Sequence, residues 1–497
     1  MGLSTALSVA QSSIAAVSAE AAVVSRNIGG VNSTGTYNEK TANVETTLDG
    51  GVQVVSVTRA QNQALFDGML AATASSATQT ALASGLTTLQ ETVGDTSSST
   101  SPAAQLSNFI DALQSYEASP SDSSLATAAV TAASSLATTL NTATATVQRV
   151  RETADAGMAN SVSTINNLLS QFQSVNSQIV SGTASGADVT DLEDTRDTIL
   201  TQLSQQIGIS TTTGANGDMS IYTDSGVTLF QGGTASSVTF QPTATYTAGT
   251  TGSAVYIDGI PVTGSSATMP IQSGTLAGLA TLRDSTAVTY QNQLDQIANG
   301  LISATSETYT PTGSAVPVTS AGLFTDAGSS AMPTSATGLA GQIQVNAAVD
   351  PTQGGNPILL GNGINTDFNA AANGGTDDAS YSAQLENLLT SLQAYQTFGS
   401  SGQLDTTNTL SGYAAASVSW LEAQQQTVSN ESGYQSTLLA STTSALSNAT
   451  GVSLDNEMSK MLDLEQSYSA SAQLMSSINT MFSSLITAVT AINGTIG

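Results

Sequence analysis

A heptad repeat of apolar residues near the C-terminus constrains the fold of this 497-residue chain more than any other feature. No proline or glycine interrupts the segment from Leu454 to Asn493, which predicts one long helix with a coiled-coil seam. The first seam position holds Leu454, Met461, Tyr468, Met475, Phe482 and Val489. The second holds Leu464, Ile478, Leu485 and Ile492, with Glu457 and Ser471 as polar gaps. Such a helix needs a partner, because alone it would expose a row of apolar side chains to water.

A similar seam near the N-terminus offers that partner. Leu3, Ala10, Val17 and Val24 are spaced by seven residues, as are Leu7, Ile14, Ala21 and Ile28. We therefore predict that the terminal helices pair as a coiled coil and also pack against neighbouring subunits. An ordinary bundle within one chain is the alternative. The residues predicted to carry self-assembly are Leu3, Leu7, Ile14, Val17, Val24, Ile28, Leu454, Met461, Leu464, Tyr468, Met475, Ile478, Phe482, Leu485, Val489 and Ile492.

The hydrophobic period changes several times between the two seams. Residues 40–58 alternate around Gly50-Gly51 and predict a β-hairpin. Helical spacing returns from about residue 60, whereas the Thr-rich stretch 208–273 has short apolar runs separated by turn dipeptides, which is typical of strands. Residues 380–447 have helical spacing again, with Tyr395 in the apolar stripe.

The predicted fold is mainly α with an inserted β domain. We expect an elongated multidomain chain with N- and C-terminal helices paired as a coiled coil, a helical-bundle middle domain and a β-rich outer domain. The predicted segments are 1–58, terminal helix and linking hairpin; 59–207, helical domain, first part; 208–273, β-rich domain, first part; 274–308, a helix of the helical domain; 309–375, β-rich domain or loops, second part; 376–450, helical domain, return part; and 451–497, C-terminal coiled-coil helix.

Composition excludes several classes of function. The chain has 8 Lys and Arg residues against 36 Asp and Glu, a net charge of −28, so it cannot neutralise many phosphates and we expect no nucleic-acid partner. It contains no Cys and no His, which rules out a Ser–His–Asp triad and a Cys-based zinc site. We therefore predict no enzyme, no catalytic or metal-binding residues and no cofactor. The sequence has no run of about 18 apolar residues, so we predict no membrane insertion. The first residues lack the basic segment of a cleaved signal peptide, so we predict none.

Two charged segments and the single tryptophan are interpreted separately. Asp188 to Asp197 is acidic and could suit calcium, but it lacks the spacing of an EF-hand loop. We favour a helix start with a solvated face and Arg196 in local pairs. Arg149 and Arg151 beside Glu152 predict a solvated, salt-bridged helix face. Trp420, the only tryptophan, is expected in the core.

Four groups of residues form recognisable motifs. The two at the chain ends are Ser25 to Ile28 with Thr34, Gly35 and Tyr37, and Gly451 to Glu457 with Leu464 to Ala472; the two internal ones are Asp191 to Asp197 with Leu203 to Ile209, and Gly274 to Leu279 with Arg283, Asp284 and Tyr290 to Ala298. The terminal motifs resemble those of flagellar rod, hook and hook-associated proteins, and the internal blocks resemble the FlgK family of hook-associated proteins.

This resemblance implies structural work. FlgK-like proteins form the junction between hook and filament, are exported unfolded through the flagellar channel without a cleaved signal peptide, and end up outside the cell. The implied partners are copies of the chain in a ring or tube, the hook protein, the second junction protein, and an export chaperone on the C-terminal helix. The alternatives are a flagellin-like filament subunit or another axial protein, and, with less support, a secreted acidic adhesin or β-rich hydrolase working through residues 208–373.

Overall fold

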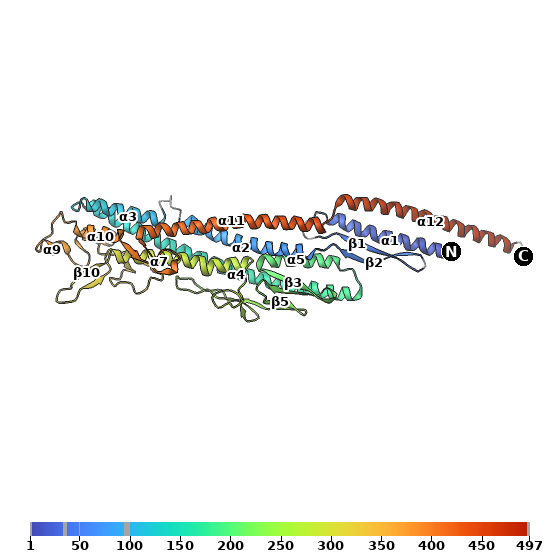
Figure 1. Cartoon of the computed structure of the whole chain (residues 1–497), viewed down its shortest axis with the longest axis horizontal. Helices are drawn as coiled ribbons and strands as arrows, with labels where there is room; N and C mark the ends of the chain where they lie inside the picture. Colours follow the sequence, from blue (N-terminus) through green and yellow to red (C-terminus); the bar gives the residue numbers. More distant parts are fainter. Residues whose placement is uncertain (1, 33–36, 49, 94–99, 495–497) are drawn as a thin grey trace.

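The computed structural model describes residues 2–32, 37–48, 50–93 and 100–494. The molecule is elongated, and both termini lie at the same end of its long axis (Figure 1). The chain runs out along this axis and returns, which confirms the predicted fold class of paired terminal helices, a helical middle and inserted β structure. The turn Thr34-Gly35 of the resemblance lies outside the described residues.

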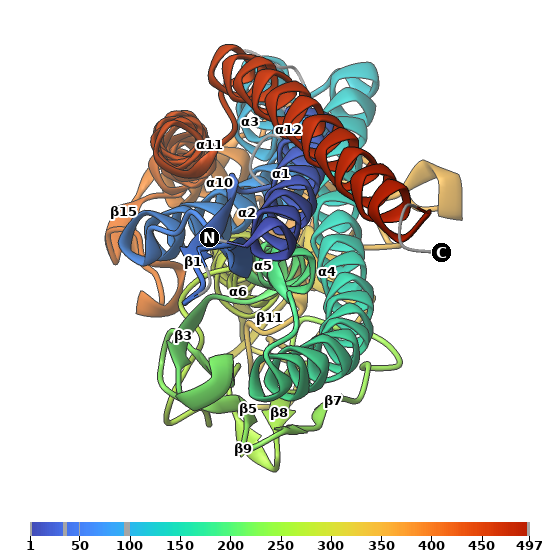
Figure 2. The ribbon, with the colours of Figure 1, turned by 90° about the vertical axis from the view of Figure 1, so that its right-hand side faces the viewer.

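Four elements form the end that carries both termini, and we call them the terminal unit. They are α1 (Leu3–Gly30), β1 (Lys40–Thr46), β2 (Val52–Arg59) and α12 (Leu454–Gly494). The strands form the predicted antiparallel hairpin, from Lys40 opposite Arg59 to Thr46 opposite Val52. Helix α1 packs against both the hairpin and α12, and α12 crosses over α1 in the end-on view of Figure 2.

The elements from α2 to α11 form the rest of the molecule, which we call the body. Its long helices are α2 (Gln63–Val93), α3 (Pro102–Glu117), α4 (Ser123–Ser185), α5 (Thr190–Gln206), α7 (Ala287–Ala304), α10 (Ala383–Gln393) and α11 (Leu410–Thr450). The short helices are α6 (Thr275–Thr281), α8 (Leu359–Asn362) and α9 (Phe368–Ala372). A π-helical turn, Leu282–Thr286, joins α6 to α7.

Helix α4 spans most of the body and contributes to two apolar cores. It starts where the Asp122 carboxylate accepts a hydrogen bond from the Ser124 amide, and it ends at Gly186, whose φ of 75° favours glycine. Its first half packs with α3, α7, α10 and α11 in one core. Its second half, around Phe172, packs with α2, α5 and the strands that follow α5 in the other core.

The β structure divides between these two cores. Strands β3 (Ile209–Thr213), β4 (Met219–Thr223), β5 (Thr228–Gln231) and β6 (Thr234–Ala235) form one sheet, and β7 (Val238–Phe240), β8 (Val255–Ile257) and β9 (Ile260–Pro261) form another. Both supply residues to the second core. The later hairpins, β10 (Glu307–Tyr309) with β11 (Val318–Ser320) and β12 (Phe324–Asp326) with β13 (Ile343–Val345), are separate sheets. The two predicted β-rich parts therefore share no sheet within the described residues.

The prediction of continuous helix through residues 380–447 was wrong. Helix α10 ends at Gln393, and the hairpin β14 (Tyr395–Thr397) and β15 (Thr407–Thr409) intervenes before α11. Tyr395 is 76% exposed instead of lying in the apolar stripe. The β-branched and turn residues between the helices favour the hairpin, and Phe398 fixes it by stacking on Tyr413 at a ring-centroid distance of 4.0 Å.

Two segments, Leu3–Gly30 and Leu410–Ala491, are long and apolar enough by mean hydropathy to cross a membrane. This is weak evidence, because core helices of proteins outside membranes satisfy the same test. The absence of membrane insertion stays a prediction.

Candidate assembly site

The structure brings the two predicted seams together along α1 and α12. Val24 and Ile478 are buried. Partly covered seam residues are Leu3, Leu7, Ile14, Val17, Ile28, Met461, Leu464, Met475 and Phe482. Leu454, Tyr468, Leu485 and Val489 are 41% to 57% exposed, and the side chain of Ile492 lies outside those described. One chain therefore covers part of its own C-terminal seam and leaves the rest open.

The open part of α12 extends beyond the predicted seam. Its exposed large apolar side chains are Leu454, Met458, Leu462, Tyr468, Leu474, Met481, Leu485, Ile486 and Val489. Figure 1 shows the C-terminal end of α12 running past the N-terminal end of α1. A long helix with so much exposed apolar surface is typical of a protein interface.

The polar gaps in the seam meet polar partners on the other helix. Glu457 is fully buried and accepts hydrogen bonds from Asn27 Nδ2 at 2.8 Å and Lys460 Nζ at 2.5 Å. The hydroxyls of Ser471 and Ser13 lie 3.2 Å apart. Buried polar pairs of this kind fix the register of two helices, because a shift along the seam would leave them without partners.

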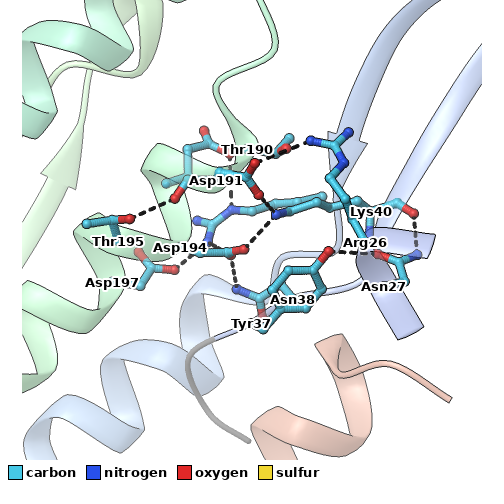
Figure 3. A network of polar contacts seen from close by, with 12 residues as sticks. Arg26, Asn27, Tyr37, Asn38, Lys40, Thr190, Asp191, Asp194, Thr195 and Asp197 are labelled. Atoms are coloured by element: carbon cyan, nitrogen blue, oxygen red, sulfur yellow. Dashed lines mark hydrogen bonds and ion pairs between the residues drawn. The ribbon is translucent and has the colours of Figure 1, made fainter. Parts of the chain in front are cut away.

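Ion pairs connect the terminal unit to the N-terminal half of α5 (Figure 3). Arg26, Lys40 and Arg59 lie on the terminal unit, and their acidic partners lie on or just before α5. Arg26 contacts Asp188 at 3.0 Å and Asp191 at 3.3 Å. Lys40 contacts Asp191 and, at 3.1 Å, Asp194. Arg59 contacts Glu193 at 3.1 Å, Asp194 at 3.1 Å and Asp197 at 2.6 Å. We call these eight residues the junction network.

Burial and pairing act in opposite directions on these groups. Burial alone would lower the pKa of Lys40, but hydrogen bonds to Asp191 and Asp194 prevail and raise it. Burial acts to raise the pKa of Asp188, yet hydrogen bonds from Thr190 and the pair with Arg26 hold it below its usual range. Burial raises the pKa of Asp197 despite the opposing charge of Arg59.

The interpretation of Asp188 to Asp197 as a solvated face was therefore wrong. Asp194, Arg196 and Asp197 are buried, and Arg196 donates to the carbonyl oxygen of Gly217 at 2.6 Å. The cations that pair with this segment lie more than a hundred residues away in sequence, so local spacing gave no sign of them. No metal-binding group of His, Cys, Asp or Glu is present among the residues that the structure describes.

Arg151 also departs from its predicted solvated face. It is buried and donates to the carbonyl oxygens of Arg283 at 3.1 Å and Thr247 at 2.9 Å. It therefore binds the loop between β7 and β8 to α4, and burial lowers the pKa of its guanidinium. Trp420 packs at the edge of the first core and is partly buried.

A groove of about 500 Å³ lies between α2, α4 and α6. Its lining is mostly Ala, Ser, Thr and Leu, and Arg149 is its only ionisable residue.

Two family models match parts of this chain. Residues 86–310 match the family model of the flagellar hook-associated protein FlgK helical domain, and residues 444–488 match that of the flagellar basal body rod FlgEFG protein C-terminal region. The second match covers the end of α11 and most of α12, and the first covers most of the body up to β10.

Two curated relatives are similar over the same share of the chain. Flagellar hook-associated protein 1 of Escherichia coli (strain K12) is 25% identical over 309 residues, which are 60% of this chain and 55% of the relative. Flagellar hook-associated protein 1 of Salmonella typhimurium (strain LT2) is 25% identical over 306 residues, with the same coverage of 60% and 55%. The chain thus spans just over half the length of the curated relatives it matches.

Among solved structures, the flagellar hook junction protein FlgK from Burkholderia pseudomallei matches with a TM-score of 0.42 and 21% sequence identity. The match covers 52% of this chain and 46% of that one, and a score of this size does not establish a shared fold. The two family-model matches and the curated relatives agree with the resemblance of the terminal and internal motifs. The chain belongs to the FlgK family of flagellar hook-associated proteins.

Proposed function

We propose that this chain is a structural subunit of the bacterial flagellum that forms the junction between hook and filament. The observation that carries the proposal is the open apolar surface of α12, which persists although α1 already covers one side of the helix. Burying apolar surface is the main driving force of association, at roughly 25 cal/mol per Å². An axial subunit needs such a surface, whereas an isolated soluble protein does not.

The proposed partners follow from the same surface. Copies of the chain in a ring or tube, the hook protein and the second junction protein would cover α12 in the assembled flagellum. An export chaperone would cover it before export, which we propose proceeds through the flagellar channel without a cleaved signal peptide. Its proposed location is extracellular, and its role is structural, without catalysis, nucleic-acid binding or membrane insertion.

The alternatives have less support. A filament subunit would share the paired terminal helices, but the match to the FlgK helical domain covers residues 86–310. That same match includes β3 to β9. These strands belong to residues 208–373, the region in which an adhesin or hydrolase would need a working site of its own.

The proposal is tested by complementing a deletion of the gene in the source bacterium. Electron microscopy of the deletion strain should show hooks without filaments, with monomeric filament protein in the medium. The unmodified chain should restore filaments. The double variant Leu485→Ser, Val489→Ser should not, because it removes apolar contacts from the open end of α12 while the monomer stays folded.

A matched control is Val318→Ser, which changes an exposed apolar residue on β11 of the body. It should restore filaments like the unmodified chain. Normal filaments in the deletion strain would contradict the proposed role at the junction. Normal filaments formed with the double variant, exported in normal amounts, would contradict the proposed role of α12.

A further inference from the structure

The groove between α2, α4 and α6 has a long wall of small side chains. This wall is the face of α2 from Thr73 to Thr88, and every lining residue on it is Ala, Ser, Thr or Gly. At about 1.5 Å per residue the wall is about 22 Å long. Leu279 of α6 and Leu439 of α11 add apolar groups to the lining. A surface of this shape accepts large side chains from a partner, because the gaps between small residues act as holes for them.

Arg149 places one unpaired positive charge at this groove. Its side chain is exposed, lines the groove from α4, and has no hydrogen bond or ion pair within the described part of the chain. Every other Lys and Arg has such a partner there. In a chain with a net charge of −28, a cation without a carboxylate favours a partner that brings an acidic group.

Helix α11 carries side chains that match the groove in size and charge. Glu431, Tyr434 and Leu438 lie three and seven residues apart and so share one face of the helix. We call these three residues the α11 stripe. Tyr434 is 61% and Leu438 37% exposed, and no other large apolar side chain is as exposed on the long body helices that the structure describes. Glu431 accepts a hydrogen bond from Gln435 at 2.6 Å and has no cation partner among the described residues.

The groove and the α11 stripe are separate surfaces at one level of the molecule. Leu438 of the stripe and Leu439 of the groove are neighbours in sequence, so they lie about 1.5 Å apart along the helix axis. The stripe residues point roughly 80° to 140° round the helix from Leu439, at about 100° per residue. One chain can therefore accept a neighbour in its groove and offer its own stripe to another neighbour.

We propose that the α11 stripe of one copy docks into the groove of the next copy. Tyr434 and Leu438 would lie between the small side chains of α2, and Glu431 would pair with Arg149. Helices α4 and α11 both run toward the terminal unit (Figure 1). Arg149 is the first α4 residue in the groove, and Glu431 precedes Leu438 on α11. Copies that stand side by side in the same orientation therefore bring the two charges to the same end of the contact.

The symmetry of this contact favours a ring. Two different surfaces meet, so the contact is heterologous and continues from copy to copy. Because both surfaces lie at the same level of the long axis, neighbours need little displacement along it, and such a contact closes into a ring rather than growing into a helical filament. The contact lies in the body and does not require the terminal helices to be folded. It rests on the proposed function only in that copies of the chain must assemble side by side.

Cross-linking between two single-Cys variants tests the contact. The chain has no Cys, and Ser84→Cys in the groove and Thr427→Cys on the stripe face of α11 both replace exposed side chains. Leu446 and Phe66 line one pocket between α11 and α2. Thr427 lies 19 residues before Leu446, and Ser84 lies 18 residues after Phe66. The two positions are therefore at nearly the same level, and a disulfide forms when the Cα atoms come within about 7 Å.

The two variants are expressed together in the deletion strain, and isolated flagella are oxidised. Electrophoresis should show a disulfide-linked species of twice the 49.9-kDa mass of the chain, whereas either variant alone should give none. If the strain forms no filaments with these variants, the oxidised mixture of the two purified full-length chains at high concentration decides instead. The docking contact and the role at the junction can thus fail separately.

Charge reversal tests the predicted ion pair. Arg149→Glu in the Ser84→Cys chain should lower the cross-linked fraction about fivefold, as expected for the loss of a partly exposed pair. Adding Glu431→Arg to the Thr427→Cys chain should restore it. Glu386→Arg makes the same change of charge at an exposed residue of α10 and should not restore it. Circular dichroism should show unchanged helix content in every variant.

Filling the groove is a second test that does not change the charge. Thr80→Trp adds a large side chain at an exposed position of the α2 wall and should abolish the cross-link. The absence of a cross-linked species from both flagella and the concentrated mixture would overturn the proposal, as would cross-linking that neither Arg149→Glu nor Thr80→Trp changes. Cross-linking of Ser84→Cys to Ser476→Cys on α12 in place of Thr427→Cys would also overturn it, because the groove would then hold a terminal helix.

Discussion

Glu457 shows how one residue can contribute specificity in place of apolar area. It occupies a seam position where a leucine would add buried surface, yet its carboxylate binds Asn27 of α1 and Lys460 of its own helix. Replacing one partner of a buried hydrogen bond costs about 1–3 kcal/mol, because the remaining group stays buried and unpaired. The register of α1 on α12 therefore depends on a residue that weakens the apolar seam.

We expect Glu457→Leu to destabilise the α1–α12 pair despite its larger apolar side chain. The Asn27 amide would keep its bond to the Lys40 carbonyl oxygen but lose the one to Glu457, and faster hydrogen exchange along α1 would report the change. Glu457→Gln keeps an acceptor and should exchange at nearly the original rate. Slower exchange in Glu457→Leu would show that the seam gains more from apolar area than from the polar pair.

Lys40 gives the junction network a dependence on alkaline pH. Its pKa is raised above the ordinary value of 10.5, with burial opposing and the bonds to Asp191 and Asp194 prevailing. A cation whose pKa is higher in the folded chain contributes its full stability below the unfolded pKa and loses it as pH rises through the folded pKa. The docking of the terminal unit should therefore be steady from about pH 8 to 10 and weaken above that range.

Energy transfer between fluorophores attached through Ser476→Cys on α12 and Ser174→Cys on α4 measures this pH effect, because the chain has no other Cys. Tyrosines also ionise near pH 10, so the comparison is between the unmodified sequence and Lys40→Met, which removes the cation at every pH. The difference between the two should shrink above about pH 10.5. A difference that stays constant throughout would mean that the charge of Lys40 does not hold the terminal unit.

At the scale of helices, close backbone approach explains the motif Gly274 to Leu279. A Cβ atom on Gly278 would lie 2.5 Å from the carbonyl oxygen of Thr78 on α2. Gly274 has a φ of +96°, and a Cβ there would lie 2.6 Å from the backbone of Ile207. Gly278 therefore lets α6 cross α2 at a distance that a side chain would prevent, and Gly274 lets the chain pass the end of α5.

Gly278→Ala should therefore destabilise the body by roughly 1–3 kcal/mol, as overpacking does. Gly433→Ala is the matched control, because Gly433 lies in α11 with no atom within 4 Å of an added Cβ. It should stabilise the chain by about 0.5–1 kcal/mol through the helix propensity of alanine. Chemical denaturation with circular dichroism measures both. Equal effects of the two changes would show that α2 and α6 can move apart freely.

The elements differ in how far sequence could predict them. Hydrophobic periodicity was sufficient to predict the terminal helices and the β1–β2 hairpin, because each apolar pattern lies within one local segment. The break before α11 was missed because Tyr395 continued an apolar spacing while hairpin residues followed it. Glu457 was identified as a gap, but its partner Asn27 is 430 residues away. The junction network was missed for the same reason, since only the fold brings Arg59 to Asp197, 138 residues apart.

At the scale of the whole molecule, salt should act on two processes in opposite directions. Copies of a chain with a net charge of −28 repel one another, so added salt should favour their association through α12. The junction network within each chain is an attraction between opposite charges, so salt should weaken it.

The separation of the cores leads to a prediction for a truncated chain. Removing Leu454 to Gly497 deletes α12, which supplies no described residue to either body core. We expect the body to stay folded, with a thermal midpoint within about 2 °C of the full chain by circular dichroism, because the apolar burial that stabilises it is unchanged. The shortened chain should also lose the ability to restore filaments.

A core substitution gives the reference change in thermal midpoint. Phe172 is fully buried on α4 and packs edge-to-face on Phe230 of β5 at a ring-centroid distance of 4.9 Å. Phe172→Ala should cost about 3–5 kcal/mol and lower the midpoint of the full chain by roughly 10 °C. If removal of α12 lowered the midpoint as much as Phe172→Ala does, the body would depend on the terminal unit for its folding, and a boundary held only by ion pairs would be the wrong description.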